Sequence, residues 1–168
     1  MPRFGSRSRK NLATCHEDLQ DLFNEVIKYV DCSVIEGSRS KERQNKLYEE
    51  GRTKVKYPKG RHNANPSNAV DVVPYPIDWD DRERFHLFAG FVLGIARSMG
   101  INLRWGGDWN QNFEVDDKER FHLFAGFVLG IAQSMEINIR WGGDWNKNFE
   151  VDDNKFDDFP HFELLKEF

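Results

Sequence analysis

Two histidines and two aspartates occupy positions where they could serve metal-assisted hydrolysis. The first pair is His62, in a polar loop, and Asp71, inside the apolar run of residues 69–73. A carboxylate in an apolar strand is costly to bury without a partner. A metal ion would offset that cost, but an arginine partner or a capped turn would do the same. The residues around Asp71 therefore leave a metal site and a structural role open.

The second pair lies near the C-terminus, where His161 follows Asp158 by three residues at the start of a predicted strand. The imidazole can bind zinc, and the carboxylate can then reach a zinc-bound water. Two imidazole nitrogens, one carboxylate oxygen and an open position make a catalytic rather than a structural zinc site. Zinc lowers the pKa of its water towards neutral, and a nearby base takes the remaining proton. Asp157 is the rival to Asp158, and Glu163 would share the side of His161 on a strand.

The remaining histidines and the two cysteines point to structural roles. His86 and His122 each lie beside a phenylalanine on a predicted helix, and His16 lies near a helix start. Cys15 and Cys32 fit no zinc-ribbon spacing. In a cytosolic protein they are expected to stay as buried thiols.

The second half contains an internal repeat with an offset of 36 residues. Residues 80–117 and 116–153 differ at five of 38 aligned positions, so the tandem copies are 80–115 and 116–151. Each copy predicts a helix, a half-buried strand and a Gly-Gly-Asp turn. Two copies are too few for a solenoid. We interpret the repeat as a duplication inside a single domain of residues 1–168.

The helix boundaries in the two copies differ at one informative position. Asp80 is the expected N-cap of the first helix, with Glu83 completing a capping box, and Gly100 is its stop. Glu136 replaces that glycine in the second copy, which loses the preferred left-handed cap. This favours the first helix as the one in the ancestral place. The expected apolar faces are Phe85, Phe88, Val92, Ile95 and Met99, and Phe121, Phe124, Val128, Ile131 and Met135.

The other elements complete an α+β pattern. Helices are expected over residues 16–30 and 40–51, and short strands over residues 33–35, 69–73 and 162–165. A further strand in the repeat is expected at residues 101–105. Helices and short strands without regular βαβ alternation predict an α+β fold. We expect a small antiparallel sheet flanked by helices, with the zinc site on the sheet and the helix–strand unit duplicated.

Composition excludes several classes of protein. The chain has 168 residues, of which 39% are hydrophobic and 31% charged, as in a globular domain. The net charge of −4, with both signs interspersed, argues against nucleic acid as a partner. No apolar run approaches the ~20 residues of a membrane span, and no apolar segment of a signal peptide follows the basic N-terminus. We therefore expect a cytoplasmic protein in the producing cell.

Four segments, in this order, carry a resemblance to a known family. The chain resembles the zinc D-Ala-D-Ala carboxypeptidases and L-alanyl-D-glutamate endopeptidases, which include phage endolysins and vancomycin-resistance carboxypeptidases. Each segment is weak alone, but the ordered set is specific and covers nearly the whole chain when the repeat is counted once. The segments are Glu36-Gly37-Ser38-Arg39-Ser40, His62 with Ala69-Val70-Asp71, Arg104-Trp105-Gly106-Gly107-Asp108-Trp109, and Asp158-Phe159-Pro160-His161-Phe162-Glu163-Leu164.

The resemblance implies a role for each matching residue. His62, Asp71 and His161 are the implied ligands of Zn²⁺. Asp158 is the implied general base towards water and then the general acid towards the leaving amine. Arg39 is implied to hold a substrate carboxylate or to steady the oxyanion.

Gln44 is implied to line the same cleft. The implied activity is that of a zinc metallopeptidase that hydrolyses peptide bonds in peptidoglycan stem peptides. The expected absence of a signal peptide suits a phage endolysin of the L-alanyl-D-glutamate endopeptidase type, which acts on the cell wall after release. A D-Ala-D-Ala carboxypeptidase is the alternative. An inactive wall-binding or structural protein is the alternative from another class, and the charge pattern supports a nuclease poorly.

The sequence departs from the family pattern at two places. The commonest first motif is Ser-x-His with an aspartate seven residues after the histidine, whereas here Gly60 replaces the serine and the spacing is nine. Ser67 replaces the common glycine four residues before Asp71. A longer loop of this kind occurs among phage and bacterial members, so the ligand assignment is kept, and the departure puts substrate preference in doubt.

None of the implied ligands lies in the repeat, so the sequence predicts one metal site. The duplication adds a second apolar helix face that must be buried. Either copy could fill the core with the other extruded, or the first helix could join the second strand with the middle extruded. The surplus helix could then pack on a second chain as a homo-oligomer or a domain swap.

Overall fold

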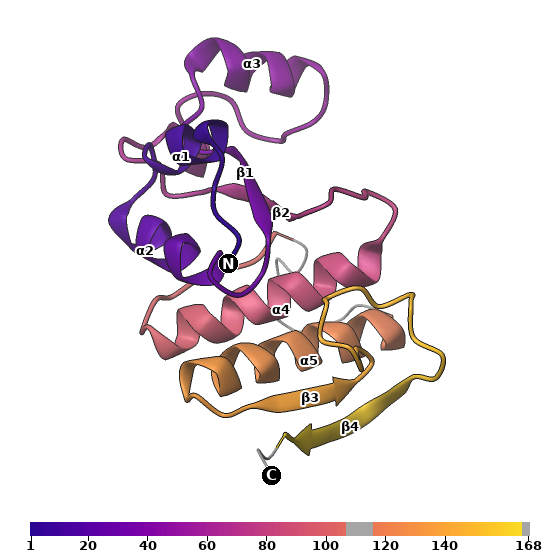
Figure 1. Cartoon of the computed structure of the whole chain (residues 1–168). Coiled ribbons are helices and arrows are strands. Elements are labelled where there is room, and N and C mark those ends of the chain that lie inside the picture. The colour runs from indigo at the N-terminus through magenta and orange to yellow at the C-terminus, as the bar shows by residue number, and fades with distance from the viewer. Residues whose placement is uncertain (107–115, 166–168) are drawn as a thin grey trace. The chain divides into compact units, whose positions relative to one another are not determined.

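The computed structural model describes residues 1–106 and 116–165, and the chain forms two compact units, Met1–Ile77 and Asp78–Phe168. Each unit combines helices with one small antiparallel sheet (Figure 1). The α+β class is therefore confirmed, and the single predicted sheet is corrected to two sheets of two strands. One domain over residues 1–168 stays a prediction.

The first unit is built around a short two-stranded sheet. Strands β1 and β2 are antiparallel, with Glu36 opposite Asp71 beside an irregularity in β1. Leu22, Val26 and Val34 are almost completely buried and form part of its core. Its elements are α1 (Ser6–Leu12), α2 (Glu17–Val26), β1 (Cys32–Glu36), α3 (Lys41–Glu49), the 3₁₀ turn η1 (Arg61–Asn63) and β2 (Asp71–Pro74).

Two of its helices show how local sequence sets their ends. Ser40 caps α3 as predicted, because its hydroxyl accepts a hydrogen bond from the Arg43 backbone N–H at 3.2 Å. Helix α2 stops at Val26, and the predicted extension over residues 27–30 is a turn instead.

The second unit contains the two helices of the repeat, side by side (Figure 1). They run in the same direction, because Gly90 and Gly94 of one approach Leu123 and Phe127 of the other in the same order. A Cβ atom on any of the four facing glycines would overlap the backbone of the opposite helix. The elements are α4 (Arg82–Ser98), α5 (Asp117–Ser134), β3 (Ile139–Gly142) and β4 (Asp158–Leu164), and the facing glycines are Gly90, Gly94, Gly126 and Gly130.

This packing confirms much of the predicted face of α4, where Phe88, Val92 and Ile95 are buried, and corrects that of α5. Leu87 and Leu123, outside those faces, are completely buried, whereas Phe124 and Met135, inside them, are more than half exposed. Small residues let the two backbones come close together, so the contact follows the glycine stripe rather than the largest side chains. The two helices pack against each other within the second unit, and which copy takes the ancestral place stays a prediction.

The caps of the two helices differ by one position. Asp116 caps α5 through the Glu119 N–H, at the place predicted for its equivalent, Asp80. In α4 the cap is Asp81, which accepts from the Arg84 N–H at 2.9 Å, so the assignment to Asp80 is wrong by one residue. Each copy has two adjacent aspartates at this place, and either of them could cap the helix.

The strand predicted at residues 101–105 is absent; residues 101–105 carry no regular structure. In the second copy the equivalent residues form β3, which pairs antiparallel with β4. A strand needs a partner for its backbone hydrogen bonds, and β4 is that partner for the second copy. The turn predicted at 106–108 lies partly outside the described residues.

The state of the two cysteines is the one that the sequence predicts. Cys15 and Cys32 are buried free thiols. Burial raises the pKa of Cys32 to about 12 and also raises that of Cys15. Among the described residues, no helix is long and apolar enough to cross a membrane.

Candidate active site

The surroundings of His62 in the first unit are held by a tight contact between the start of the loop after β1 and η1. A Cβ atom on Gly37 would overlap the Asn11 carbonyl and the Thr14 hydroxyl, so only glycine fits there. The Gly37 carbonyl lies 2.7 Å from Nδ1 of His62, and the His62 carbonyl accepts from the Arg39 N–H at 2.8 Å. These two contacts fix both the backbone and the ring of His62.

The His62 ring faces the carboxylate of Asp71. Its Nε2 lies 3.5 Å from Oδ1 of Asp71, while Oδ2 of Asp71 lies 3.4 Å from Nη2 of Arg39. Asp71 starts β2 and its side chain is 43% exposed, whereas that of His62 is 14% exposed. The arginine partner considered for Asp71 from the sequence is therefore present, and it leaves Oδ1 directed at the histidine.

The pKa values of both groups are shifted in the direction that favours their charged forms. Burial opposes the charged form of His62, but the hydrogen bonds with Asp71 and Gly37 outweigh it and raise its pKa. Burial likewise opposes ionisation of Asp71, but the hydrogen bond with His62 and the charge of Arg39 lower its pKa. Both shifts favour an ion pair between the two side chains.

Arg39 and Gln44 also lie in the cluster around Asp71. Gln44 of α3 is completely buried, accepts from Nη1 of Arg39 at 3.2 Å and donates to the Val55 carbonyl at 2.7 Å. Arg39 also donates from Nε and Nη2 to Glu36. Gln44 thus orients the arginine and does not face open solvent.

A pocket of about 590 Å³ opens beside this cluster within the first unit. It takes in Asp71 and Arg39, so it adjoins the predicted ligand and the predicted catalytic arginine. Its lining residues are Arg7, Ile35, Glu36, Arg39, Arg43, Leu47, Arg52 and Asp71.

The other predicted residues lie together on β4 of the second unit. Nδ1 of His161 is 4.0 Å from Oδ2 of Asp158, and its Nε2 is 3.4 Å from Oε2 of Glu163. Glu163 therefore lies on the side of His161, as the strand pattern predicted. Asp158 is half-buried, whereas its rival Asp157 is exposed.

Arg140 on β3 supports the histidine indirectly. It pairs with Oε1 of Glu163 through Nε and Nη2, and it stacks over the Trp145 ring at 5.2 Å. The Trp145 ring also contacts the His161 ring, with centroids 5.4 Å apart. The hydrogen bond from Arg140 lowers the pKa of Glu163, and His161 adds to this effect.

The two histidines thus use opposite ring nitrogens for their protein partners. His62 is anchored at Nδ1 and directs Nε2 at Asp71, whereas His161 is anchored at Nε2 and directs Nδ1 towards Asp158. An imidazole that is fixed through one nitrogen offers the other as a metal ligand.

The spacing within the first unit suits a metal ion. Two ligands of a tetrahedral zinc ion, each about 2.0–2.1 Å from the metal, lie roughly 3.4 Å apart. Nε2 of His62 and Oδ1 of Asp71 are separated by 3.5 Å. Within the described parts of the chain, no three His, Cys, Asp or Glu side chains form a ready metal cluster. The predicted ligands fall two in the first unit and one, His161, in the second.

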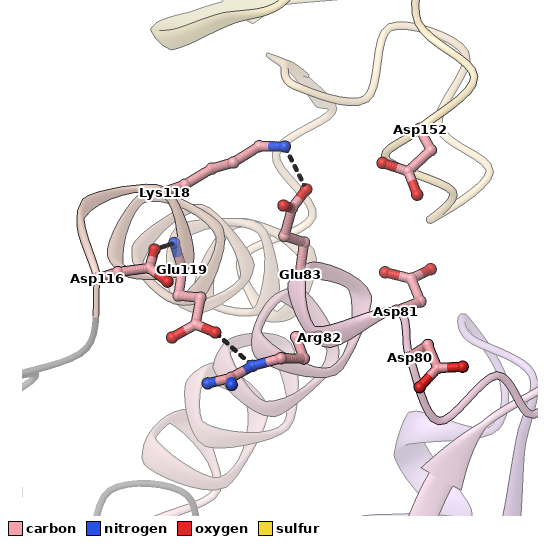
Figure 2. Close-up of a pocket in the computed structure, with 8 residues that line it drawn as sticks. All are labelled: Asp80, Asp81, Arg82, Glu83, Asp116, Lys118, Glu119 and Asp152. Atoms are coloured by element: carbon pink, nitrogen blue, oxygen red, sulfur yellow. Dashed lines mark hydrogen bonds and ion pairs between the residues drawn. The ribbon is translucent and has the colours of Figure 1, made fainter.

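A second pocket, of about 340 Å³, lies at the start of the paired helices in the second unit (Figure 2). Two of its six carboxylates, Glu83 and Glu119, are each bound by a cation from the opposite copy. Arg82 binds Glu119 at 2.7 Å, and Lys118 binds Glu83 at 2.7 Å. Residues 82 and 118 are equivalent in the repeat, as are 83 and 119, so the pair is reciprocal. This pocket contains none of the predicted site residues.

Sequence reasoning missed the arginines of the first pocket and the support of His161. Arg43 and Arg52 lie on and just after α3, in a stretch that reads as an ordinary charged helix face. Their separation from Arg39 along the chain gives no sign of a shared pocket. Arg140 was placed in a predicted strand, and its pairing with Glu163 depends on the β3–β4 register.

Comparison with known proteins adds a family match. The model of the family described as phage L-alanyl-D-glutamate peptidase matches residues 1–129. The L-alanyl-D-glutamate peptidase of Escherichia phage T5 is 31% identical over 114 residues, which cover 64% of this chain and 82% of that protein. The crystal structure of the Serratia marcescens L-Ala D-Glu endopeptidase ChiX is 25% identical. The structural alignment covers 97% of this chain and 90% of ChiX, with a TM-score of 0.41.

Proposed function

Because the chain belongs to the phage L-alanyl-D-glutamate peptidase family, we propose that it cleaves the bond between L-alanine and D-glutamate in peptidoglycan stem peptides, as an endolysin. The match covers residues 1–129, which include His62 and Asp71. The observation that carries the proposal is the anchored His62–Asp71 pair beside a pocket that also contains Arg39.

The proposed metal is zinc, held by His62, Asp71 and His161. The 3.5 Å separation of Nε2 of His62 and Oδ1 of Asp71 supports this choice. The arrangement of His161 also supports it, because Nε2 is held by Glu163 and Nδ1 lies 4.0 Å from Oδ2 of Asp158. Zinc would supply a Lewis acid and a water of lowered pKa. Gly37 and Glu163 would keep the two rings in the orientation that binding requires.

Asp158 is the proposed general base and acid. Its carboxylate would take a proton from the attacking water and return it to the amine of the leaving glutamate. Its half-buried position next to His161 supports this role over the exposed Asp157. Arg39 would stabilise negative charge on the carbonyl oxygen from its position beside Asp71.

The test is mass spectrometry of peptides released from purified peptidoglycan. Asp158→Asn should abolish release of new N-terminal glutamate, and Asp157→Asn, its neighbour in sequence, should retain most activity. The reverse result would move the catalytic role to Asp157. Release of free D-alanine instead would indicate the carboxypeptidase alternative, and no release by the wild type would indicate the inactive wall-binding protein.

Metal content tests the ligands separately from activity. Zinc bound per chain, measured by elemental analysis after dialysis, should fall in His62→Ala, Asp71→Ala and His161→Ala. Arg43→Gln is a folded control expected to keep the metal. Full zinc content in all three ligand variants would contradict the assignment.

A further inference from the structure

The pocket of the first unit has an excess of positive charge. Four arginines line it, Arg7, Arg39, Arg43 and Arg52, against two carboxylates, Glu36 and Asp71. The whole chain has a net charge of −4, so the positive pocket is a local exception. A concave positive surface attracts anionic ligands.

Arg39 has little capacity left to bind a ligand, because most of its N–H donors already bind protein groups. A guanidinium has five N–H donors. Arg39 places its Nε on Glu36, its Nη1 on Gln44, and its Nη2 on both Glu36 and Asp71, and its side chain is only 11% exposed. Four of the five donors are therefore engaged within the protein.

Arg43 and Arg52 have donors to spare. Arg43 gives its Nε to Oε1 of Glu36 at 3.2 Å, and within the described residues its Nη groups have no protein partner. Arg52 has a loose pair with Glu50 at 3.7 Å. Their side chains are 45% and 65% exposed, so a ligand in the pocket can reach both. Both carboxylate oxygens of Glu36 already accept hydrogen bonds, Oε2 from Arg39 and Oε1 from Arg43. The bond to Oε1 holds Arg43 in place.

The substrate of the proposed reaction carries a matching group. A glutamate that is joined to alanine through its nitrogen and continues the chain through one carboxyl keeps its other carboxylate free. That carboxylate belongs to the residue directly after the cleaved bond, and Asp71, a proposed zinc ligand, lines the same pocket. Arginine recognises planar carboxylates with paired N–H donors.

We propose that Arg43 and Arg52 form a subsite for the free carboxylate of the glutamate on the leaving side of the bond. This inference rests on the proposed peptidase function. It separates two roles that a single arginine was expected to fill, since Arg39 then holds Asp71 and the reacting carbonyl while Arg43 and Arg52 select the substrate. Arg7, on the same pocket from α1, adds to the positive charge.

The decisive experiment compares two synthetic peptides that differ only at that group. One contains L-alanyl-D-glutamate with the free carboxylate, and the other has it converted to the carboxamide. Wild-type kcat/KM should be at least about ten-fold higher on the acid. Arg43→Gln and Arg52→Gln should each raise KM for the acid about five-fold with little change in kcat, as loss of ground-state binding predicts. Neither should affect the amide.

Lys46→Gln is the matched control, because Lys46 is on the same helix, 69% exposed and outside the pocket lining. It should leave both peptides unaffected. Equal losses on acid and amide in the arginine variants, or no preference in the wild type, would overturn the subsite.

Calorimetry distinguishes failure of the subsite from failure of the function. Both peptides are titrated into the zinc-loaded Asp158→Asn protein and into its double variant with Arg43→Gln. Tighter binding of the acid that disappears with Arg43→Gln supports the subsite even if the wild type cleaves neither peptide, in which case only the proposed reaction fails. Equal binding of both peptides overturns the subsite whatever the turnover.

Discussion

The two copies of the repeat have nearly the same sequence and different structures. In both, a capped helix carries a histidine whose ring meets a tryptophan edge-on: His86 with Trp105 at 4.9 Å, and His122 with Trp141 at 5.2 Å. Among the described residues, only the second copy continues as a strand, β3. Trp141 is 1% exposed, whereas Trp105 is half-buried.

The difference separates what the local sequence determines from what a partner determines. Helix, cap and the histidine–tryptophan contact lie within a few turns of each other along the chain, and both copies form them. The strand depends on β4, which pairs with the second copy. Strand formation by the same residues thus follows from context, as the weak intrinsic preferences of strands predict.

The largest effect on stability is expected from replacing the tryptophans, because their burial differs between the two copies. Trp141 packs in a cluster with Leu87, Ala125 and Val151, and its Nε1 donates to the Phe159 carbonyl at 2.6 Å. Trp141→Ala should lower the free energy of unfolding by about 4 kcal/mol. Trp105→Ala should cost about 1.5 kcal/mol or less. Urea denaturation followed by circular dichroism measures both, and equal losses would remove the structural distinction between the copies.

The next prediction tests where the copies should behave alike. Gly90→Ala and Gly126→Ala each place a methyl group against the backbone of the opposite helix. Each should destabilise the protein by about 2–3 kcal/mol through overpacking. Gln133→Ala, on the exposed side of α5, should change little. A marked inequality between the two glycines in urea denaturation would show that the helix pair is not reciprocal.

A smaller effect is expected from pH. Burial is the main cause of the lowered pKa of His122, whose Nδ1 lies 2.7 Å from the Lys118 carbonyl. The unfolded chain then binds the proton more readily. Stability is therefore lost as the pH falls below the ordinary histidine value of about 6.5 towards the lower folded pKa. His122→Asn should flatten the dependence of unfolding free energy on pH between 7 and 5. An unchanged slope would exclude His122 as its source.

The smallest expected effect lies at the ends of the helices. Gly100 and Glu136 are equivalent and both have positive φ, +73° and +57°. Glycine adopts this conformation without the cost that a side chain brings, so Glu136→Gly should stabilise by roughly 1 kcal/mol and Gly100→Glu should destabilise by the same amount. Thermal denaturation of the two exchanges checks the symmetry, and stabilisation by Gly100→Glu would contradict it.

The sequence predicted those features that depend on neighbouring residues. Ser40 as a cap and positive φ at Gly100 follow from side-chain chemistry within a few positions. The strand predicted at residues 69–73 is found, but it begins at Asp71 instead of enclosing it. The pairing of His62 with Asp71 was predictable as a hypothesis, because a carboxylate in an apolar run needs a partner.

Features that depend on distant contacts were not predictable. The helix pairing through Gly90 and Gly126 reverses the usual expectation that the largest apolar side chains define the buried face. The anchoring of Arg140 on Glu163 requires the register of β3 and β4. The pocket of Arg43 and Arg52 brings together residues of α1, β1, α3 and β2, which lie far apart along the chain. No spacing rule along a single chain contains this information.

The burial of both native thiols makes this chain convenient for site-specific labelling. The thiolate is the form that reacts with maleimides and related probes, and the raised pKa values of Cys15 and Cys32 keep it scarce at neutral pH. A cysteine introduced at an exposed position, such as Lys46 in the first unit or Gln133 in the second, should take up a fluorophore selectively. One probe on each unit would then report on that unit by itself, with the native cysteines left in place.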